Sequence, residues 1–207
     1  MPPQPPPTRT GLARAMSKLG FCSRSRATEL IRMGKVKVNL VVRKNPEFPV
    51  ILKKDVIIMD DVSINQAPRL YVMLNKPRGL VTSASDELGR ETVFSCFENS
   101  KLPHLSPVGR LDKASEGMLL FTNDNVWADT ITNPDTHLDK TYHVQISGTI
   151  DEKRIALIKE GVVDEEQGDH LSAKVIKILR SGEKNMWLEV VLDEGRNRHI
   201  RRLLEAF

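Results

Sequence analysis

The sequence has 207 residues, 40% of them hydrophobic and 28% charged, which is ordinary for a globular protein of one or two domains. It holds no apolar run of the roughly 20 residues needed to cross a bilayer and no signal-peptide pattern, so we expect a cytoplasmic protein without a membrane partner. The two cysteines lie far apart and the five histidines show no ligand spacing, so we expect neither a disulfide framework nor a metal site.

Positive charge is concentrated near the N-terminus. The formal net charge is only +4, yet residues 9 to 54 carry twelve basic side chains and two acidic ones. A surface with this balance is typical of a protein that binds a polyanion.

The first elements of the chain are predicted to be a tail and two helices. Residues 1–10 are rich in proline and have nothing to bury, which predicts a disordered tail. From Gly11 to Gly20 the apolar residues recur at helical spacing, and a second helix is expected from Ser23, a good N-cap, to Gly34.

Two short strands are expected next. Val36, Val38 and Leu40 alternate with polar residues, which indicates a half-buried strand, and residues 55–58 form a second apolar run. The polar stretch 60–68 is expected to be a linker between domains.

This succession of helices and strands, over residues 11–60, resembles the S4 domain, a small RNA-binding domain named after a ribosomal protein. The resemblance rests on residues 19–24, LGFCSR, and residues 31–39, IRMGKVKVN. It departs from the family at Leu40, where glycine usually occupies the hairpin turn. The resemblance implies an RNA-facing side made of Ser23, Arg24, Arg26, Arg32, Lys35 and Lys37. Phosphate contacts of this kind give affinity but no sequence readout.

A second domain is expected over residues 69–207. It opens with an apolar strand, residues 70–74, followed by the turn Asn75-Lys76-Pro77-Arg78-Gly79. Because proline and glycine take the chain out of a sheet, we expect Lys76 and Arg78 to project from this turn towards RNA.

The most distinctive stretch is VGRLDKASEGMLLFTND, residues 108–124. It sets one carboxylate, Asp112, in a turn between Gly109-Arg110 and an apolar strand that starts near Gly117. A single carboxylate in such a turn suits nucleophilic, covalent catalysis, whereas glycoside hydrolysis normally uses a pair of carboxylates.

The rest of the chain mixes strands and helices. Strands are predicted at 140–146, 171–179 and 186–192, and helices after Asp124, at 151–160 and after a cap at Asn197. This mixture predicts an α+β fold whose second domain has a mixed, mainly antiparallel sheet with flanking helices.

Residues 108–124, the Asn75–Gly79 turn and the basic motif at 194–202 together resemble the pseudouridine synthases that modify ribosomal RNA, in particular the RsuA and RluB branch. The resemblance implies isomerisation of uridine to pseudouridine, for which the base must flip out of its stack. No cofactor is implied, because the reaction has no net redox change.

The resemblance also assigns roles to single residues. It implies that Asp112 is the nucleophile, that Tyr142 packs on the flipped base, and that Arg201 pairs with Asp112 and keeps it ionised. Arg110 would help to hold the RNA open at the mouth of the site.

The final motif and Trp187 resemble the large-subunit type. Arg196 and Arg198 are expected to contact phosphates, and the expected partner is large-subunit ribosomal RNA, either free or in an assembly intermediate, bound by a monomer. Family members generally continue beyond such a motif, so we expect either that the C-terminal part of the catalytic domain is truncated at Phe207 or that the fold closes differently.

Two alternatives remain open at this point. The first is a non-catalytic RNA-binding or ribosome-associated protein on the same scaffold, against which the presence of Asp112, Tyr142 and Arg201 argues. The second is an RNA methyltransferase with the same N-terminal domain, which would need a glycine-rich cofactor loop that the sequence lacks.

Overall fold

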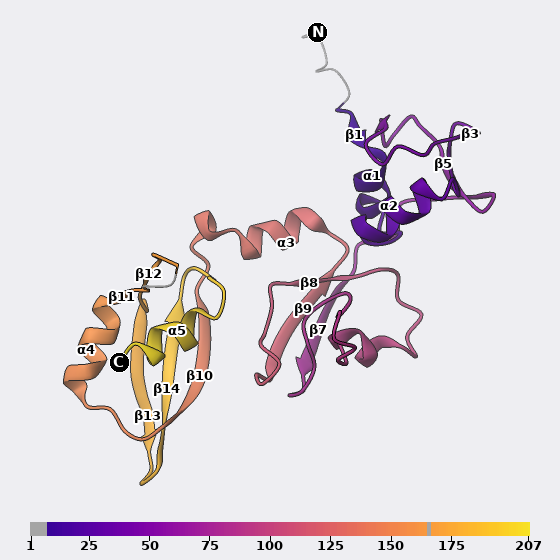
Figure 1. Ribbon diagram of the computed structural model, residues 1–207. Helices are drawn as coiled ribbons and strands as arrows, with labels where there is room; N and C mark the ends of the chain where they lie inside the picture. Colours follow the sequence, from indigo (N-terminus) through magenta and orange to yellow (C-terminus); the bar gives the residue numbers. More distant parts are fainter. Residues whose placement is uncertain (1–7, 165–166) are drawn as a thin grey trace. The chain divides into compact units, whose positions relative to one another are not determined.

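The computed structural model describes residues 8–164 and 167–207, so most of the predicted proline-rich tail lies outside the described residues (Figure 1). The chain divides into two compact units, Met1–Ala128 (unit 1) and Asp129–Phe207 (unit 2). None of the helices within the described residues is long and apolar enough to span a membrane.

The N-terminal part of unit 1 holds two helices and two small sheets. The sheet order is β3-β2-β5-β6, all antiparallel, with a separate antiparallel pair β1-β4. The elements are β1 (Thr10–Gly11), α1 (Leu12–Lys18), α2 (Arg24–Arg32), β2 (Val36–Val38), β3 (Val41–Val42), β4 (Pro49–Val50), β5 (Ile57–Met59) and β6 (Val62–Ser63). One buried cluster joins the helices to the strands, with Leu12, Met16, Ile31, Val36 and Ile57 among its members.

Both predicted helices are confirmed, and so is the cap of the second. The Ser23 hydroxyl accepts a hydrogen bond from the backbone N–H of Arg26 at 3.1 Å, which satisfies one free donor at the start of α2. Gly34 follows α2 with a φ of 74°, a left-handed conformation that ends the helix.

Two residues of the expected linker lie in a strand, and the expected end of the first strand is wrong. Val62–Ser63 lies inside the stretch predicted to be a linker but forms β6 on the edge of the sheet. Leu40 does not continue β2 as a buried residue; it lies in the β2–β3 turn with 78% of its surface exposed. Asn39 and Leu40 both have positive φ, 49° and 70°, as a two-residue hairpin turn of this hand requires.

We expect Leu40→Gly to stabilise this domain. A left-handed backbone costs a non-glycine residue roughly 1–2 kcal/mol, and Leu40 is too exposed to recover that cost by burial. Amide exchange in β2 and β5 should slow by about fivefold, a net gain of about 1 kcal/mol. Leu88→Gly is the control, because Leu88 is also exposed, at 76%, but its φ is not positive. An unchanged exchange rate in Leu40→Gly would contradict strain at the turn.

The second part of unit 1 is a three-stranded antiparallel sheet in the order β7-β9-β8. Its elements are β7 (Tyr71–Lys76), the 3-10 helix η1 (Val93–Phe97), β8 (Ser106–Val108) and β9 (Gly117–Thr122). Val72, Leu74, Leu119 and Phe121 on the strands pack with Val93 of η1 in one cluster. This part contains the whole stretch from Val108 to Thr122 that carries Asp112.

Helix α3 (Asn125–Thr132) follows β9, and the division between the two units falls within it. Its predicted cap is confirmed, because the Asp124 carboxylate accepts hydrogen bonds from the backbone N–H groups of Val126 and Trp127. The same carboxylate accepts a bond from the Tyr71 hydroxyl at 3.0 Å. Asp124 therefore ties the start of α3 to β7.

Unit 2 is built on the antiparallel sheet β10-β14-β13. Its elements are the 3-10 helix η2 (Pro134–Thr136), β10 (Lys140–Ser147), α4 (Glu152–Glu160), β11 (Val162–Val163), β12 (His170–Leu171), β13 (Val175–Ser181), β14 (Asn185–Leu192) and α5 (His199–Glu205). Ile158 of α4 and Leu203 of α5 pack in the same buried cluster as Leu188 and Val190 of β14. Helices and antiparallel sheets are thus mixed in both units, and the predicted α+β class is confirmed.

The predicted cap of the last helix is wrong by one residue. The N-cap of α5 is Arg198, in a left-handed conformation with φ of 51°, and its side chain makes no capping hydrogen bond. Asn197 lies one position too early to accept from the first turn of the helix.

Candidate active site and RNA-binding surface

Asp112 lies in the loop that joins β8 to β9. Its side chain is exposed, and its backbone carbonyl accepts a hydrogen bond from the Ser115 N–H at 3.0 Å, which closes a tight turn. The predicted turn is therefore present, with the carboxylate facing solvent, where it can reach a large substrate.

A buried lysine side chain fixes the backbone of this turn by hydrogen bonds. Lys76, at the end of β7, is 0% exposed. Its ammonium group donates hydrogen bonds to the backbone carbonyls of Pro77 at 3.1 Å, Asp112 at 3.1 Å and Ser115 at 2.8 Å. Three donors meet three carbonyls, so the ammonium is fully satisfied although it is buried. We call this group of bonds the Lys76 clamp.

The expectation that Lys76 projects towards RNA is therefore wrong. Along β7, Val72, Leu74 and Lys76 fall on the same side of the strand, the side that packs into the core. This alternation is the signal in the sequence that could have placed Lys76 inside. Burial lowers the pKa of Lys76, while the negative charge of Asp112 acts in the opposite direction.

Two further contacts fix the same loop. The Gly79 N–H donates to the Lys113 carbonyl at 2.8 Å. The Thr82 hydroxyl donates to the Leu111 carbonyl at 2.8 Å and accepts from the Leu111 N–H at 3.3 Å. The residues on both sides of Asp112 are thus bonded to the segment that follows β7.

The arginines of these two loops remain at the surface. Arg78 is exposed and lies 3.2 Å from the carboxylate of Glu116, in an ion pair whose partners are both well solvated. Arg110, two residues before Asp112, is exposed as well. Both are therefore open to RNA phosphates from solvent.

Tyr142 lies on β10 in unit 2, opposite Val190 of β14. Its ring is half-buried against the core of that unit, and burial raises the pKa of its hydroxyl. A phenol in this setting stays neutral at physiological pH. It suits packing against the ring of a substrate better than acting as a general base.

Arg201 and Arg202 are neighbours on α5 with opposite environments. Arg201 is exposed. Arg202 is only 12% exposed and donates to Asp169 at 2.9 Å and to Gln167, with Asp164 3.4 Å away. Arg202 therefore anchors α5, while Arg201 is available to a ligand.

The two other arginines of the final motif also differ. Arg196 donates to Asp169 at 2.5 Å and to Glu194 at 3.0 Å, so its charge is already paired within unit 2. Arg198 is exposed. Of the two expected phosphate contacts, Arg198 has the more accessible guanidinium group.

The basic motif at 194–202 makes His199 a candidate RNA contact, but the structure buries it. It is 3% exposed, and its Nε2 donates to the Ser172 carbonyl at 3.0 Å. Its Nδ1 is buried without a hydrogen-bond partner among the described residues and lies 4.0 Å from Glu194. His199 and Leu203 share one face of α5, the face that packs inward, so helical spacing could have indicated this burial.

Unit 2 should lose stability when the pH falls below neutrality. Burial lowers the pKa of His199 in the folded protein below the value of about 6.5 that it has in the unfolded chain. The neutral ring therefore contributes its full stability above a pH of about 6.5. That contribution is lost as the pH falls through the pKa of the folded state. Urea unfolding followed between pH 7.5 and pH 5 should show this loss, at most about 1.4 kcal/mol per pH unit for one proton.

His199→Gln should flatten this pH dependence, whereas substitution of the exposed His143 should leave it unchanged. An equal slope in wild type and His199→Gln would contradict the role of the buried imidazole.

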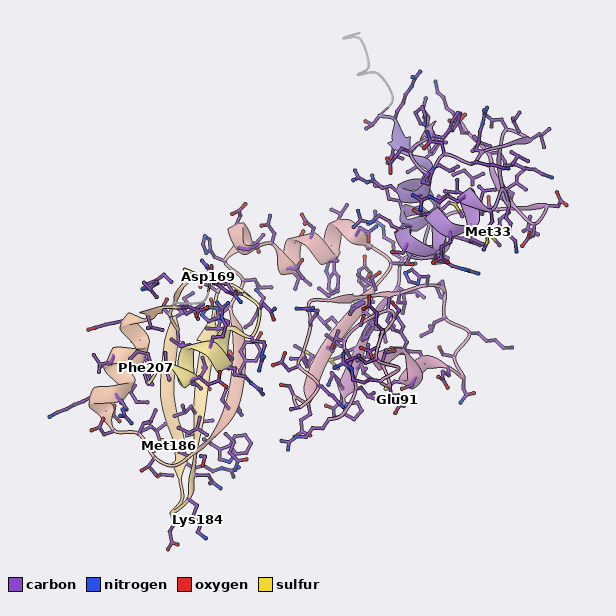
Figure 2. The ribbon with its side chains drawn as sticks, in the orientation of Figure 1. Met33, Glu91, Asp169, Lys184, Met186 and Phe207 are labelled. Carbon is purple, nitrogen blue, oxygen red and sulfur yellow. The ribbon has the colours of Figure 1, made fainter. Side chains whose placement is uncertain are left out.

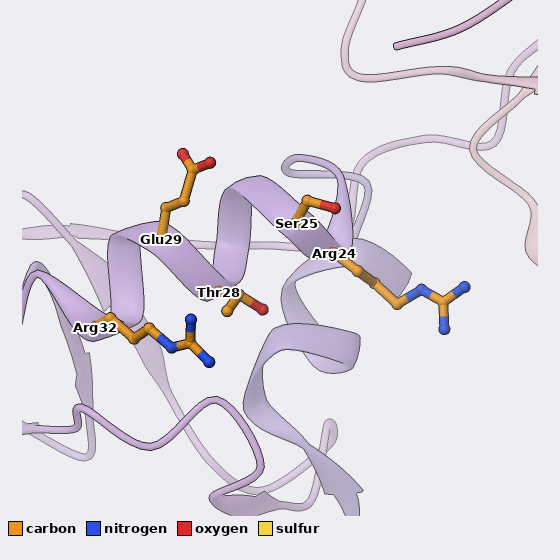
Figure 3. Close-up of a pocket in the computed structure, with 5 residues that line it drawn as sticks. All are labelled: Arg24, Ser25, Thr28, Glu29 and Arg32. Carbon is orange, nitrogen blue, oxygen red and sulfur yellow. The ribbon is translucent and has the colours of Figure 1, made fainter. Parts of the chain in front are cut away.

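The predicted RNA-facing residues of the S4 part lie mainly on α2. Arg24, Thr28 and Arg32 follow one another at four-residue spacing and line an open groove of about 570 Å³ with Ser25 and Glu29. Figure 3 shows the two arginines extending from opposite ends of the helix, with Glu29 pointing to the other side in this view. Arg24 and Arg32 are eight residues apart, a rise of about 12 Å along α2, so their guanidinium groups can meet separate phosphates of one RNA strand.

The remaining residues of this predicted surface have partners within the domain. Arg26 pairs with Glu29 at 2.9 Å, Lys37 pairs with Asp61 at 2.7 Å, and Ser23 is occupied as a cap. Lys35 is exposed. Within the described residues, Arg24, Arg32 and Lys35 are thus the cations of this face without an ion-pair partner.

The predicted residues fall into two groups. Unit 1 brings Asp112 and Arg110 into one loop. The Lys76 ammonium is hydrogen-bonded to the backbone of that loop, and Arg78 lies on the adjacent turn. Tyr142, Arg196, Arg198 and Arg201 all belong to unit 2.

Comparisons with known proteins agree on one family. The family model described as RNA pseudouridylate synthase matches residues 70–206, and the S4 domain model matches residues 10–57. A Rickettsia felis protein named as an RNA pseudouridine synthase is 38% identical, over 95% of this chain and 83% of its own length. The ribosomal large subunit pseudouridine synthase B of Bacillus subtilis is 32% identical, over 94% of this chain and 79% of its own length.

A solved structure supports the same relationship. The crystal structure of a pseudouridylate synthase, 29% identical in sequence, superimposes with a TM-score of 0.61 and covers 95% of this chain and 83% of that chain. The resemblance seen in the sequence is therefore confirmed, and the chain belongs to the RNA pseudouridylate synthase family, a family of isomerases, with an S4 domain before its synthase domain.

Proposed function

We propose that this enzyme isomerises one uridine of large-subunit ribosomal RNA to pseudouridine, with Asp112 as the nucleophile. In this reaction the bond between N1 of the base and C1′ of the ribose breaks, and a bond between C5 and C1′ forms. The C5 proton leaves and N1 gains a proton, so atoms and electrons balance without an oxidant or reductant. Covalent attachment through one carboxylate divides this exchange into two easier steps.

The observation that carries the proposal is the exposed Asp112 carboxylate on a loop whose backbone is fixed by the Lys76 clamp. A nucleophile held by its own backbone keeps its position when a large, flexible substrate arrives, which lowers the entropic part of the barrier. The charge of Asp112 in turn favours the protonated form of Lys76, whose hydrogen bonds hold the loop.

The roles of the residues in unit 2 follow from the family's motifs. We infer that Tyr142 packs on the base after it flips, at a cost of a few kcal/mol for unstacking, and that Arg201 is the basic residue of the final motif that takes part in the same reaction. The neutral phenol and the exposed guanidinium described above support these roles. Arg24, Arg32, Lys35, Arg78, Arg110 and Arg198 would supply phosphate contacts.

The name of the Bacillus subtilis relative supports the large subunit as the source of the substrate. The test is to incubate purified protein with protein-free large-subunit RNA, protein-free small-subunit RNA and a large-subunit assembly intermediate, and to map pseudouridine by position. A single new site on large-subunit RNA is expected. If only the small-subunit RNA were modified, the proposed substrate would be wrong. If the protein bound tightly but modified none of the RNA samples, the proposed catalysis would be refuted.

Arg201→Ala and Arg202→Ala should separate catalysis from stability. Arg201 is exposed, so its loss should change the free energy of unfolding by less than about 0.5 kcal/mol while pseudouridine formation falls by orders of magnitude. Arg202→Ala should destabilise unit 2 by about 3 kcal/mol, because Asp164 and Asp169 lose a half-buried partner. Thermal unfolding and single-turnover rates measure the two effects, and full activity in Arg201→Ala would exclude its catalytic role.

A further inference from the structure

The outer face of the sheet in unit 2 carries one aromatic side chain. Along β14 the residues Met186, Leu188 and Val190 are buried, so Trp187 and Glu189 point to the other face of the sheet. Tyr142 packs with the buried residues. Trp187 and Tyr142 therefore lie on opposite faces of the same sheet.

A β-bulge brings an arginine to Trp187. Ile178 pairs with Leu188, but Arg180 pairs with Trp187, so Leu179 is an extra residue on β13. Without this bulge, strict alternation would place Arg180 on the buried face with Ile178, and bulges commonly serve to redirect a side chain in this way. The Arg180 guanidinium lies 4.7 Å from the centroid of the Trp187 ring.

These residues line a pocket. His143, Leu179, Arg180 and Trp187 surround a cavity of about 430 Å³, which we call the Trp187 pocket. It opens beside the β13–β14 hairpin, whose turn carries Lys184 and whose strand β14 carries Met186, both labelled in Figure 2. The pocket has a flat indole wall, an apolar side and one guanidinium group.

The charges around the pocket favour an anionic ligand. Glu189, the acidic residue on this face of β14, lies 3.6 Å from Lys177, whose positive charge offsets its own, and 3.8 Å from the His143 ring. Arg180 has no carboxylate partner among the described residues of unit 2. Its charge is therefore available to a phosphate.

We propose that the Trp187 pocket binds a base of an unpaired RNA segment, stacked on the Trp187–Arg180 pair, with Arg180 also contacting the adjacent phosphate. Indole and guanidinium planes both stack on bases, and RNA supplies a flat ring and an anion together. Because the pocket lies on the face opposite Tyr142, this base is not the one that reacts. The inference rests on the proposed function and adds a second contact that helps to hold the RNA.

Tryptophan fluorescence tests the proposal directly, because the chain has two tryptophans and Trp127→Phe leaves Trp187 as the one reporter. Titration of the full-length Trp127→Phe protein with single-stranded oligouridylate should quench its emission. An abasic oligomer of equal length should not quench, because it has phosphates but no bases. Equal quenching by both oligomers, or by neither, would overturn the proposal.

Binding of a labelled oligouridylate gives the second measurement. Trp187→Ala and Arg180→Gln should each weaken binding by about tenfold. Arg154→Gln is the matched control, since it removes one exposed positive charge from α4, which packs on the other side of the sheet. If Arg180→Gln and Arg154→Gln weakened RNA binding equally, the weakening would come from net charge alone, and the proposal would be overturned.

The outcomes separate this inference from the proposed function. Pseudouridine formation without base-dependent quenching would overturn the Trp187 pocket alone, whereas quenching without pseudouridine formation would overturn the proposed function and support the pocket. The Trp187 emission could instead change with protein concentration and not with added RNA. That result would assign this face to contacts between copies of the chain and overturn the RNA proposal.

Discussion

Replacing Asp112 with asparagine is expected to abolish pseudouridine formation, with a fall in single-turnover rate on the order of 10⁴-fold or more, as for other nucleophiles in covalent catalysis. The amide has the same shape as the carboxylate but cannot attack the substrate. Because the side chain is exposed, stability should change by less than about 0.5 kcal/mol. RNA binding should be retained, so the loss would lie in the chemical step.

The control for this substitution comes from the same loop. Glu116 is an exposed carboxylate four residues after Asp112, and Glu116→Gln makes the same chemical change. It should leave the rate within a few-fold of wild type. Comparable losses in both variants would point to a general effect of loop charge, and substantial activity in Asp112→Asn would remove Asp112 from the mechanism.

Lys76→Met is expected to destabilise unit 1 and to loosen the loop that carries Asp112. Methionine fills a similar volume but donates no hydrogen bond, so the carbonyls of Pro77, Asp112 and Ser115 would lose their shared donor inside the protein. We expect the free energy of unfolding to fall by about 2–4 kcal/mol. Amides of residues 109–116 should exchange faster, and activity should fall because the nucleophile is no longer held in place.

Lys113→Met provides the comparison, since Lys113 lies in the same loop with its side chain exposed. Its effect on stability should stay below about 0.5 kcal/mol. The difference in stability and in loop mobility between the two variants is measured by urea unfolding and by hydrogen exchange. If both variants were equally stable and equally active, the Lys76 clamp would have no role in fixing the loop.

Several features of the fold were predictable from the sequence because their causes are local. Helix α2 is set by its Ser23 cap, its apolar spacing and Gly34, all within a dozen residues. The Asp124 cap of α3 depends on N–H groups two and three residues away. The turn that carries Asp112 is closed by Ser115 within the same motif.

The features that the sequence alone did not give depend on partners far along the chain. Lys76 was expected at the surface, since lysine is rarely buried, but its acceptors lie 36 and 39 residues away on a loop that only folding brings near. Arg202 finds Asp169 across 33 residues in the same way.

One feature was decided by strand register. The position of Arg180 on the face of Trp187 depends on a single extra residue in β13, and a shift of one residue reverses the face of every side chain beyond it. The sequence by itself thus determined the family, the helices, the main strands and the turn that carries Asp112, because these follow from spacing and capping between near neighbours. Only the tertiary structure decided which charged side chains hold the loops and which are free to meet RNA, because that choice depends on contacts between distant segments.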